Sequence, residues 1–143
     1  MRALLDVNVL IALLDQAHPH HASASSWLKA HVRDGWASCP ITQNGCVRIM
    51  SQPAYPGARS PAVVGTRLRE AVMHAAHEFW PDEVSLLDER AIDMTRIHGA
   101  RQTTDAYLLA LAVRRGGRLV TFDAAIPLAV AKGASAQHIV VLA

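Results

Sequence analysis

Three aspartates stand where an apolar segment ends and a helix is expected to begin. Asp6 follows an apolar run at 3–5, Asp123 follows one at 119–122, and Asp105 opens an apolar helical segment. If the two runs are neighbouring parallel strands, their carboxyl ends meet at one edge of a sheet, where ligands bind in open α/β folds. Carboxylate oxygens are ligands that Mg²⁺ and Mn²⁺ prefer. The pattern therefore predicts a site for a hard divalent cation.

Each aspartate taken alone has a simpler explanation. Aspartate is a favoured helix N-cap and is stabilised by the positive end of the helix dipole. Clustered carboxylates behave differently, because they repel one another and raise each other's pKa unless a cation compensates. Such a cation polarises a phosphoryl oxygen and lowers the pKa of water. A phosphodiester is therefore the expected substrate class.

The segments that must position these carboxylates alternate between strand-like and helix-like patterns. Strands are expected to end at Asp6 and to span 36–39, 84–87, 118–122 and 138–142. Helices are expected over 7–15, 21–33, 40–50, 61–77, 88–98 and 104–115, with Gly99 capping the fifth and a Pro/Gly-rich loop over 51–60. This alternation predicts one α/β domain, 1–143, with a mostly parallel sheet of about five strands and helices on both faces.

Composition narrows the class of protein. The chain has 143 residues, of which 51% are hydrophobic and 18% charged, a balance that excludes disorder. Its formal charge of +2 permits a polyanionic partner without requiring one. No apolar stretch reaches the roughly 18–20 residues that cross a bilayer, so we expect a cytoplasmic protein with no membrane partner.

Cysteine and histidine offer weaker signals. Cys39 and Cys46 have neither metal-site nor redox-motif spacing and are expected to be buried free thiols. The histidines are expected to lie at the surface or to cap helices, because no set of zinc ligands converges. Those nearest to one another are His18, His20 and His21 before the second helix, and His74 and His77 on one helical face.

The ordered motifs resemble a known family. The segments LLDVNVL at 4–10, TTDAYLLA at 103–110 and TFD at 121–123 resemble a PIN domain. HPHH at 18–21 before Trp27, PITQNG at 40–45 and VRI at 47–49 narrow the resemblance to the VapC toxins of bacterial toxin–antitoxin pairs. The likeness extends over essentially the whole chain, and its strength lies in the ordered set.

This resemblance implies a metal-dependent endoribonuclease. Asp6, Asp105 and Asp123 would be the acidic ligands of one or two Mg²⁺ or Mn²⁺ ions, and Asn8 and Thr121 match positions that support the site by hydrogen bonds. It further implies a tRNA or rRNA substrate, a homodimer and a VapB-like antitoxin. That antitoxin would lay a helix in an apolar groove, and its arginine would neutralise the acidic site. Segments 51–60 and 61–77 match parts of that groove in the family, although their apolar positions equally suit an ordinary core.

The chain departs from the family at one place. Most PIN domains carry a further acid early in the helix after the second strand, but residues 42–48 contain none. Either three carboxylates suffice, or Gln43 or Asn44 serves as a neutral ligand or water holder. Arg101, four residues before Asp105, is either a solvated surface arginine or a residue that borders the site and engages RNA phosphate.

Three functions compete on the sequence alone. The first is a Mg²⁺- or Mn²⁺-dependent endoribonuclease toxin. The second is a catalytically weak PIN-like module that binds RNA or protein. The third is an α/β phosphohydrolase of small phosphate esters, but Asp6-Val7-Asn8 lacks the second aspartate of the haloacid dehalogenase motif. Without a basic tail or an aromatic stacking platform, RNA recognition is expected to depend on shape and local sequence.

Overall fold

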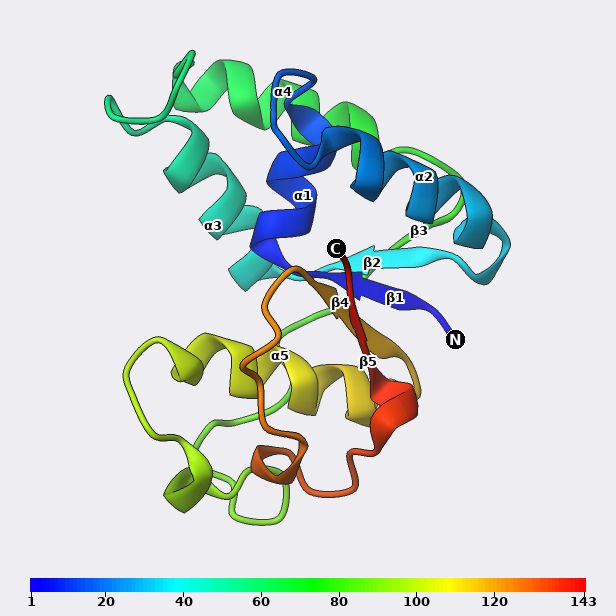
Figure 1. Ribbon diagram of the computed structural model, residues 1–143, viewed down its shortest axis with the longest axis vertical. Coiled ribbons are helices and arrows are strands. Elements are labelled where there is room, and N and C mark those ends of the chain that lie inside the picture. Colours follow the sequence, from blue (N-terminus) through cyan, green and yellow to red (C-terminus); the bar gives the residue numbers. More distant parts are fainter.

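A five-stranded parallel sheet forms the centre of the fold (Figure 1). The computed structural model describes residues 1–143. The strand order is β3-β2-β1-β4-β5, and every neighbouring pair is parallel. The strands are β1 (Ala3–Leu5), β2 (Trp36–Ser38), β3 (His77–Phe79), β4 (Arg118–Thr121) and β5 (Ile139–Val141). The predicted α/β class with five parallel strands is confirmed.

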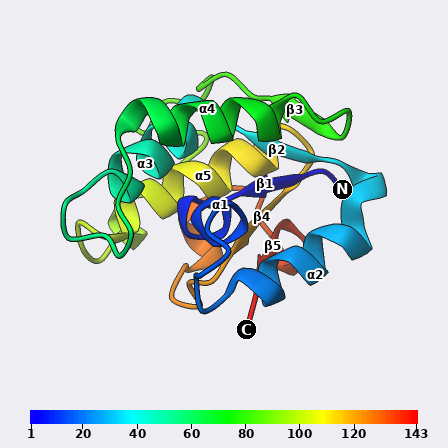
Figure 2. The same cartoon turned by 90° about the horizontal axis from the view of Figure 1, so that it is seen from above.

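Helices cover both faces of this sheet, as predicted. Four lie on one side, and α5 lies on the other (Figure 1). Seen from above, α1 stands end-on in the middle of its layer, with the other three helices around it (Figure 2). The helices are α1 (Val7–Leu14), α2 (His21–His31), α3 (Pro40–Met50), α4 (Pro61–Val72) and α5 (Gln102–Arg114). No helix is long and apolar enough to cross a membrane.

The two central strands are buried on both faces. In β1, Leu4 packs against the α5 layer and Leu5 against the α1 layer, because successive side chains of a strand point to opposite faces. Leu119 and Val120 repeat this arrangement in β4. Strands buried on both faces are continuous apolar runs, which is why β1 and β4 were predictable.

The predicted strand at 84–87 is wrong. The third strand is His77–Phe79, and α4 ends at Val72 instead of 77. β3 is an edge strand with a polar sequence and half-exposed to exposed residues, so it lacks the apolar run typical of a buried strand. Val84 and Leu86 pack on the α5-side core without pairing, which accounts for their alternating pattern.

The predicted helix at 88–98, with Gly99 as its cap, is also wrong. Asp88 accepts the backbone N–H of Arg90 at 2.9 Å, and Asp93 accepts that of Thr95 at 3.1 Å. Such aspartate turns compete with helix formation. The segment consists of turns, a bridge between Ile92 and Ala131, and a 3₁₀ turn at Met94–Arg96.

Smaller differences concern element ends. The remaining predicted helices and strands agree with the structure to within two residues. His74 lies in a turn and His77 in β3, so they share no helical face. Asp123 begins a turn rather than a helix, since its Oδ1 accepts the N–H of Ala125 at 2.8 Å. Both cysteines are buried and free, as predicted.

Close packing of α1 on α3 depends on Gly45. A Cβ at this position would lie 2.8 Å from Cγ2 of Val7, a stiff β-branched side chain. We therefore expect Gly45→Ala to destabilise the fold by about 1–2 kcal/mol despite its better helix propensity. Thermal unfolding should show a Tm lower by about 3–8 °C.

Gly65 in α4 provides the matched control for this prediction. A Cβ there would meet no atom within 4 Å, so Gly65→Ala should leave the Tm unchanged or raise it. Equal Tm values for the Gly45→Ala variant and the wild type would contradict this prediction, because α1 and α3 would then accommodate the added methyl group without loss of stability.

Candidate acidic site

The site is built where β1 and β4 end side by side. Leu5 pairs with Val120, and the backbone N–H of Asp6 donates to the carbonyl of Val120 at 2.9 Å. Asp123 lies two residues after the end of β4, and Asp105 lies in the first turn of α5. All three carboxylates line one open pocket of about 770 Å³. The structure therefore brings together the three predicted acids, contributed by three elements.

A buried hydroxyl connects two of these segments. Oγ1 of Thr121 donates to Oδ2 of Asp6 at 2.7 Å and accepts the N–H of Asp123 at 3.0 Å. Nδ2 of Asn8 lies 3.4 Å from the same hydroxyl, and Oδ1 of Asn8 accepts the N–H of Phe122 at 3.3 Å. Asn8 and Thr121 thus lie beside Asp6, and their hydrogen bonds hold the backbone N–H groups of Phe122 and Asp123.

Burial dominates the electrostatics of Asp6. The side chain is 5% exposed, and this burial raises its pKa above the usual value. The negative charge of Asp123 raises the pKa further, while hydrogen bonds from Thr121 and from the N–H of Val7 lower it. Asp6 also caps α1, because its Oδ1 accepts the N–H of Val7 at 2.7 Å. The same carboxylate therefore serves as a helix cap and as part of the pocket wall.

Asp105 carries the larger shift. Burial is the largest cause. The charges of Asp6 and Asp123 and a hydrogen bond to Asp123 raise the pKa further, to about 7. Both burial and the two neighbouring carboxylates therefore disfavour the charged form of Asp105. Oxygen donors in this charge state suit Mg²⁺ or Mn²⁺. No three acidic, histidine or cysteine side chains of the chain already surround one point, so ligand side chains would have to close around an ion.

Gln43 and Asn44, the two neutral candidates of α3, lie on different surfaces. Asn44 lines the acidic pocket. Gln43 lies outside it, because successive helical residues point about 100° apart, and its Nε2 donates to Oγ of Ser38 at 3.0 Å. Arg101 is exposed at the N-cap of α5 and is not part of the pocket wall. The structure therefore brings Asn44 to the acids but not Gln43 or Arg101.

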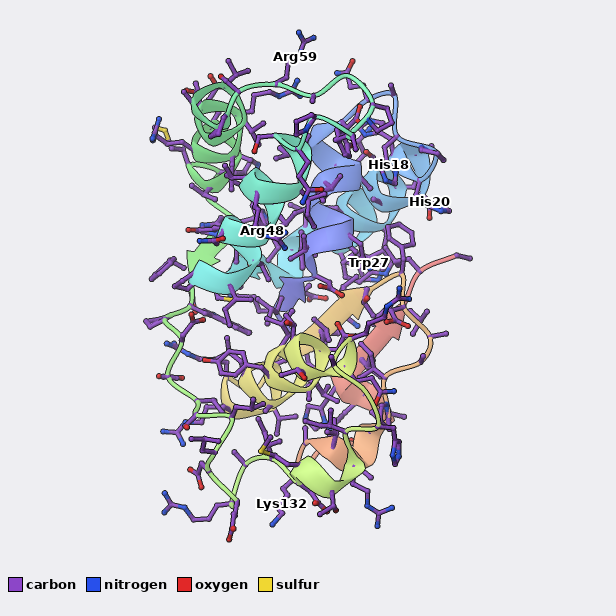
Figure 3. The ribbon with its side chains drawn as sticks, turned by 90° about the vertical axis from the view of Figure 1, so that its left-hand side faces the viewer. His18, His20, Trp27, Arg48, Arg59 and Lys132 are labelled. Carbon is purple, nitrogen blue, oxygen red and sulfur yellow. The ribbon has the colours of Figure 1, made fainter.

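Sequence reasoning missed other residues of the pocket wall. Arg48 lies one helical turn after Asn44, on the same face of α3, and makes no ion pair. The i, i+4 spacing was a signal that could have identified it. Figure 3 shows Arg48 on α3, with α1 between it and the loop of His18 and His20. His18 also lines the pocket. The wall therefore carries carboxylates together with a guanidinium and an imidazole.

A fourth carboxylate, Asp82, lines the same pocket. It follows β3, and its place at the common strand edge depends on the strand that the sequence did not reveal. Burial raises its pKa, but its charge is not among the causes of the raised pKa of Asp6 or Asp105. Asp82 therefore lines the pocket without contributing to the raised pKa of either aspartate.

The sequence is similar to that of known ribonucleases. Residues 3–132 match the family profile described as "PIN domain". The chain is 53% identical over 142 residues to "Ribonuclease VapC44" of Mycobacterium tuberculosis (strain ATCC 25618 / H37Rv), covering 99% of this chain and 100% of that protein. It is 47% identical over 127 residues to "Ribonuclease VapC39" of the same strain, covering 88% and 91%.

Two solved structures have a similar fold. One is a chain of the "Crystal structure of VapBC2 from Rickettsia felis bound to a DNA fragment from their promoter", with a TM-score of 0.62, 13% identity, and coverage of 86% of this chain and 89% of that one. The other is Mycobacterium tuberculosis VapC20, titled a "Sarcin-Ricin loop cleaving toxin", with a TM-score of 0.61, 13% identity, and coverage of 86% and 91%. At this identity, they support the fold alone.

Proposed function

Because this chain belongs to the PIN-domain family and, within it, to the VapC ribonucleases, we propose that it is an endoribonuclease toxin dependent on Mg²⁺ or Mn²⁺. Its substrate would be an internal phosphodiester of a tRNA or rRNA. The observation that carries this proposal is the shared pocket of Asp6, Asp105 and Asp123, in which two carboxylates have raised pKa values.

The three aspartates would hold the divalent ion. When bound, the ion would supply Lewis-acid chemistry, polarising the phosphoryl group and lowering the pKa of water. Through the hydrogen bonds described above, Thr121 orients the carboxylate of Asp6, and Thr121 and Asn8 hold the backbone N–H groups of Asp123 and Phe122. Such outer partners hold ligands in place and strengthen metal binding.

Residues of α3 would bind the phosphate. Arg48 has no carboxylate partner and lines the pocket, so its guanidinium is free to pair with a phosphate oxygen. Asn44, one turn earlier, adds an amide donor without adding negative charge. We propose that Asn44 and Arg48 orient the RNA backbone. Gln43 and Arg101 are second-rank candidates, because both lie outside the pocket wall.

A partner would control this activity. The neighbouring fold from Rickettsia felis belongs to a VapBC pair. By extension, we propose a cognate VapB-like antitoxin whose arginine neutralises the acidic pocket, together with a cytoplasmic homodimer of the toxin. Residues 1–143 would act as one domain.

The test is cleavage of structured RNA by the purified chain. With Mn²⁺ or Mg²⁺, end-labelled tRNA and rRNA fragments should be cut internally at discrete positions. EDTA should stop the reaction, and adding excess Mn²⁺ should restore it. Addition of the cognate antitoxin should suppress it. Cleavage that continues unchanged in EDTA would contradict the assigned chemistry.

The alternative is a PIN-like module that binds RNA or protein without efficient cleavage. The absence of an acid from the first turns of α3 favours it, as does the lack of three preassembled ligands. This module would bind RNA equally well with and without EDTA and would cut no RNA in the same experiment.

A further inference from the structure

Three rings from two distant segments form a row beside the acidic pocket. His20 stacks on Phe122, with ring centroids 4.7 Å apart and an interplanar angle of 30°. His18 lies tilted against His20, with centroids 5.8 Å apart. The histidines precede α2, whereas Phe122 directly follows β4. We refer to His18, His20 and Phe122 as the ring row.

Both ends of the ring row meet the acidic site. His18 lines the pocket itself. Phe122 stands between Thr121, which hydrogen-bonds to Asp6, and Asp123, which lines the pocket. Adjacent Cα atoms are about 3.8 Å apart, so Phe122 is one residue from a carboxylate of the site. A nucleotide with its phosphate in the pocket therefore has a base within reach of the ring row.

The loop that carries the histidines is held by its own hydrogen bonds. The N–H of His20 donates to Nδ1 of His18 at 3.1 Å, and the N–H of His21 donates to the carbonyl of His18 at 3.0 Å. The N–H of His18 donates to the carbonyl of Asp15 at 3.0 Å. A surface that is already ordered loses little conformational entropy when a ligand binds.

The ring row is also accessible. His20 is exposed, and His18 and Phe122 are half-buried. Figure 3 shows His18 and His20 on the loop before α2, with Trp27 farther along that helix. A comparable stack of His31 on Trp27, with centroids 4.1 Å apart, lies outside the pocket wall. The chain therefore contains one such stack beside the acids and one away from them.

We propose that the ring row is a stacking platform for an unpaired nucleobase next to the RNA bond held in the acidic pocket. This inference rests on the proposed function. Aromatic and histidine rings stack on nucleobases, and they require bases that are free of a duplex. Such stacking tolerates any base, since every base has a π face. This proposal departs from the expectation from sequence that the chain has no stacking platform.

Binding of RNA that carries a fluorescent base tests the platform. A short single-stranded RNA with 2-aminopurine at one position, moved stepwise along the strand, is titrated with the full chain in EDTA. Stacking quenches this fluorophore, so quenching should be strongest at one position. We expect His20→Ala and Phe122→Leu to abolish that quenching and to weaken binding by about 5- to 100-fold. His20→Phe should restore both.

His31→Ala is the matched control, because it removes an imidazole from the stack on α2 that lies away from the pocket. It should keep wild-type affinity and quenching. The same RNA annealed into a duplex should bind the wild type no better than it binds the His20→Ala variant. Wild-type affinity and quenching in both His20→Ala and Phe122→Leu would overturn the proposal, as would a lower Tm without a change in affinity.

Cleavage by the wild type with Mn²⁺ is measured on the same RNAs. If the wild type cuts no RNA but His20→Ala still loses the quenching, the platform stands and the proposed hydrolysis fails. If the wild type cuts RNA and His20→Ala changes neither KM nor quenching, the platform fails and the hydrolysis stands.

Discussion

Replacing Asp105 by Asn is expected to lower RNA cleavage by about 10²- to 10³-fold, the loss typical of removing one preorganised electrostatic group. Asp105 is the carboxylate on which the charges of Asp6 and Asp123 converge, and Asn removes its charge while keeping its shape. Initial rates with saturating Mn²⁺ measure the effect. Binding of Mn²⁺, followed by calorimetry, should weaken in parallel and provides a measurement independent of activity.

The matched control for this variant is Asp82→Asn. Asp82 lines the same pocket, but its charge does not contribute to the raised pKa of Asp105. We expect a loss of less than about tenfold, because a charge that does not perturb Asp105 has little electrostatic effect on the site. Equal losses for Asp82→Asn and Asp105→Asn would mean that Asp82 belongs to the ligand set.

Asp105→Asn should also stabilise the metal-free protein at alkaline pH. The pKa of Asp105 is about 7 in the folded chain against an ordinary value of 3.8, so the folded state binds more protons between these two pH values. Stability therefore falls as pH rises from about 4 through about 7. After allowance for solvent screening, we expect Asp105→Asn to gain about 1–2 kcal/mol at pH 8, or about 3–8 °C in Tm. At pH 4, its Tm should equal that of the wild type.

Replacing Thr121 by Val is expected to lower both stability and activity. Valine keeps the shape but removes the hydroxyl that donates to Asp6 and accepts the N–H of Asp123. A buried carboxylate oxygen then loses its donor, at a cost of about 1–3 kcal/mol, which corresponds to a Tm lower by about 3–12 °C. Loss of an outer hydrogen-bond partner of a metal ligand typically costs about 10- to 100-fold in activity.

The pH profile distinguishes this effect from a general loss of stability. The hydrogen bond from Thr121 lowers the pKa of Asp6, so Thr121→Val should raise that pKa and move the acidic limb of the activity profile to higher pH. Thr121→Ser keeps the hydroxyl and should retain the profile. A wild-type profile for the valine variant would show that Thr121 supports the backbone but not Asp6.

Much of the acidic site was predictable from local patterns. β1 is buried on both faces and appears as an apolar run that ends next to Asp6, and β4 carries the buried pair Leu119 and Val120 shortly before Asp123. The long apolar pattern of α5 likewise placed Asp105 in its first turn. These features are local because each run identifies its own element, and parallel strands must end at the same edge.

The sequence by itself determined the order of the carboxylates and the elements that present them. Only the tertiary structure decided what surrounds them. β3 depends on pairing of His77 with Trp36, and so does the position of Asp82 at the strand edge. The ring row depends on a contact between His20 and Phe122. Neither contact leaves a periodic signal, because each joins side chains that meet only after the sheet has assembled.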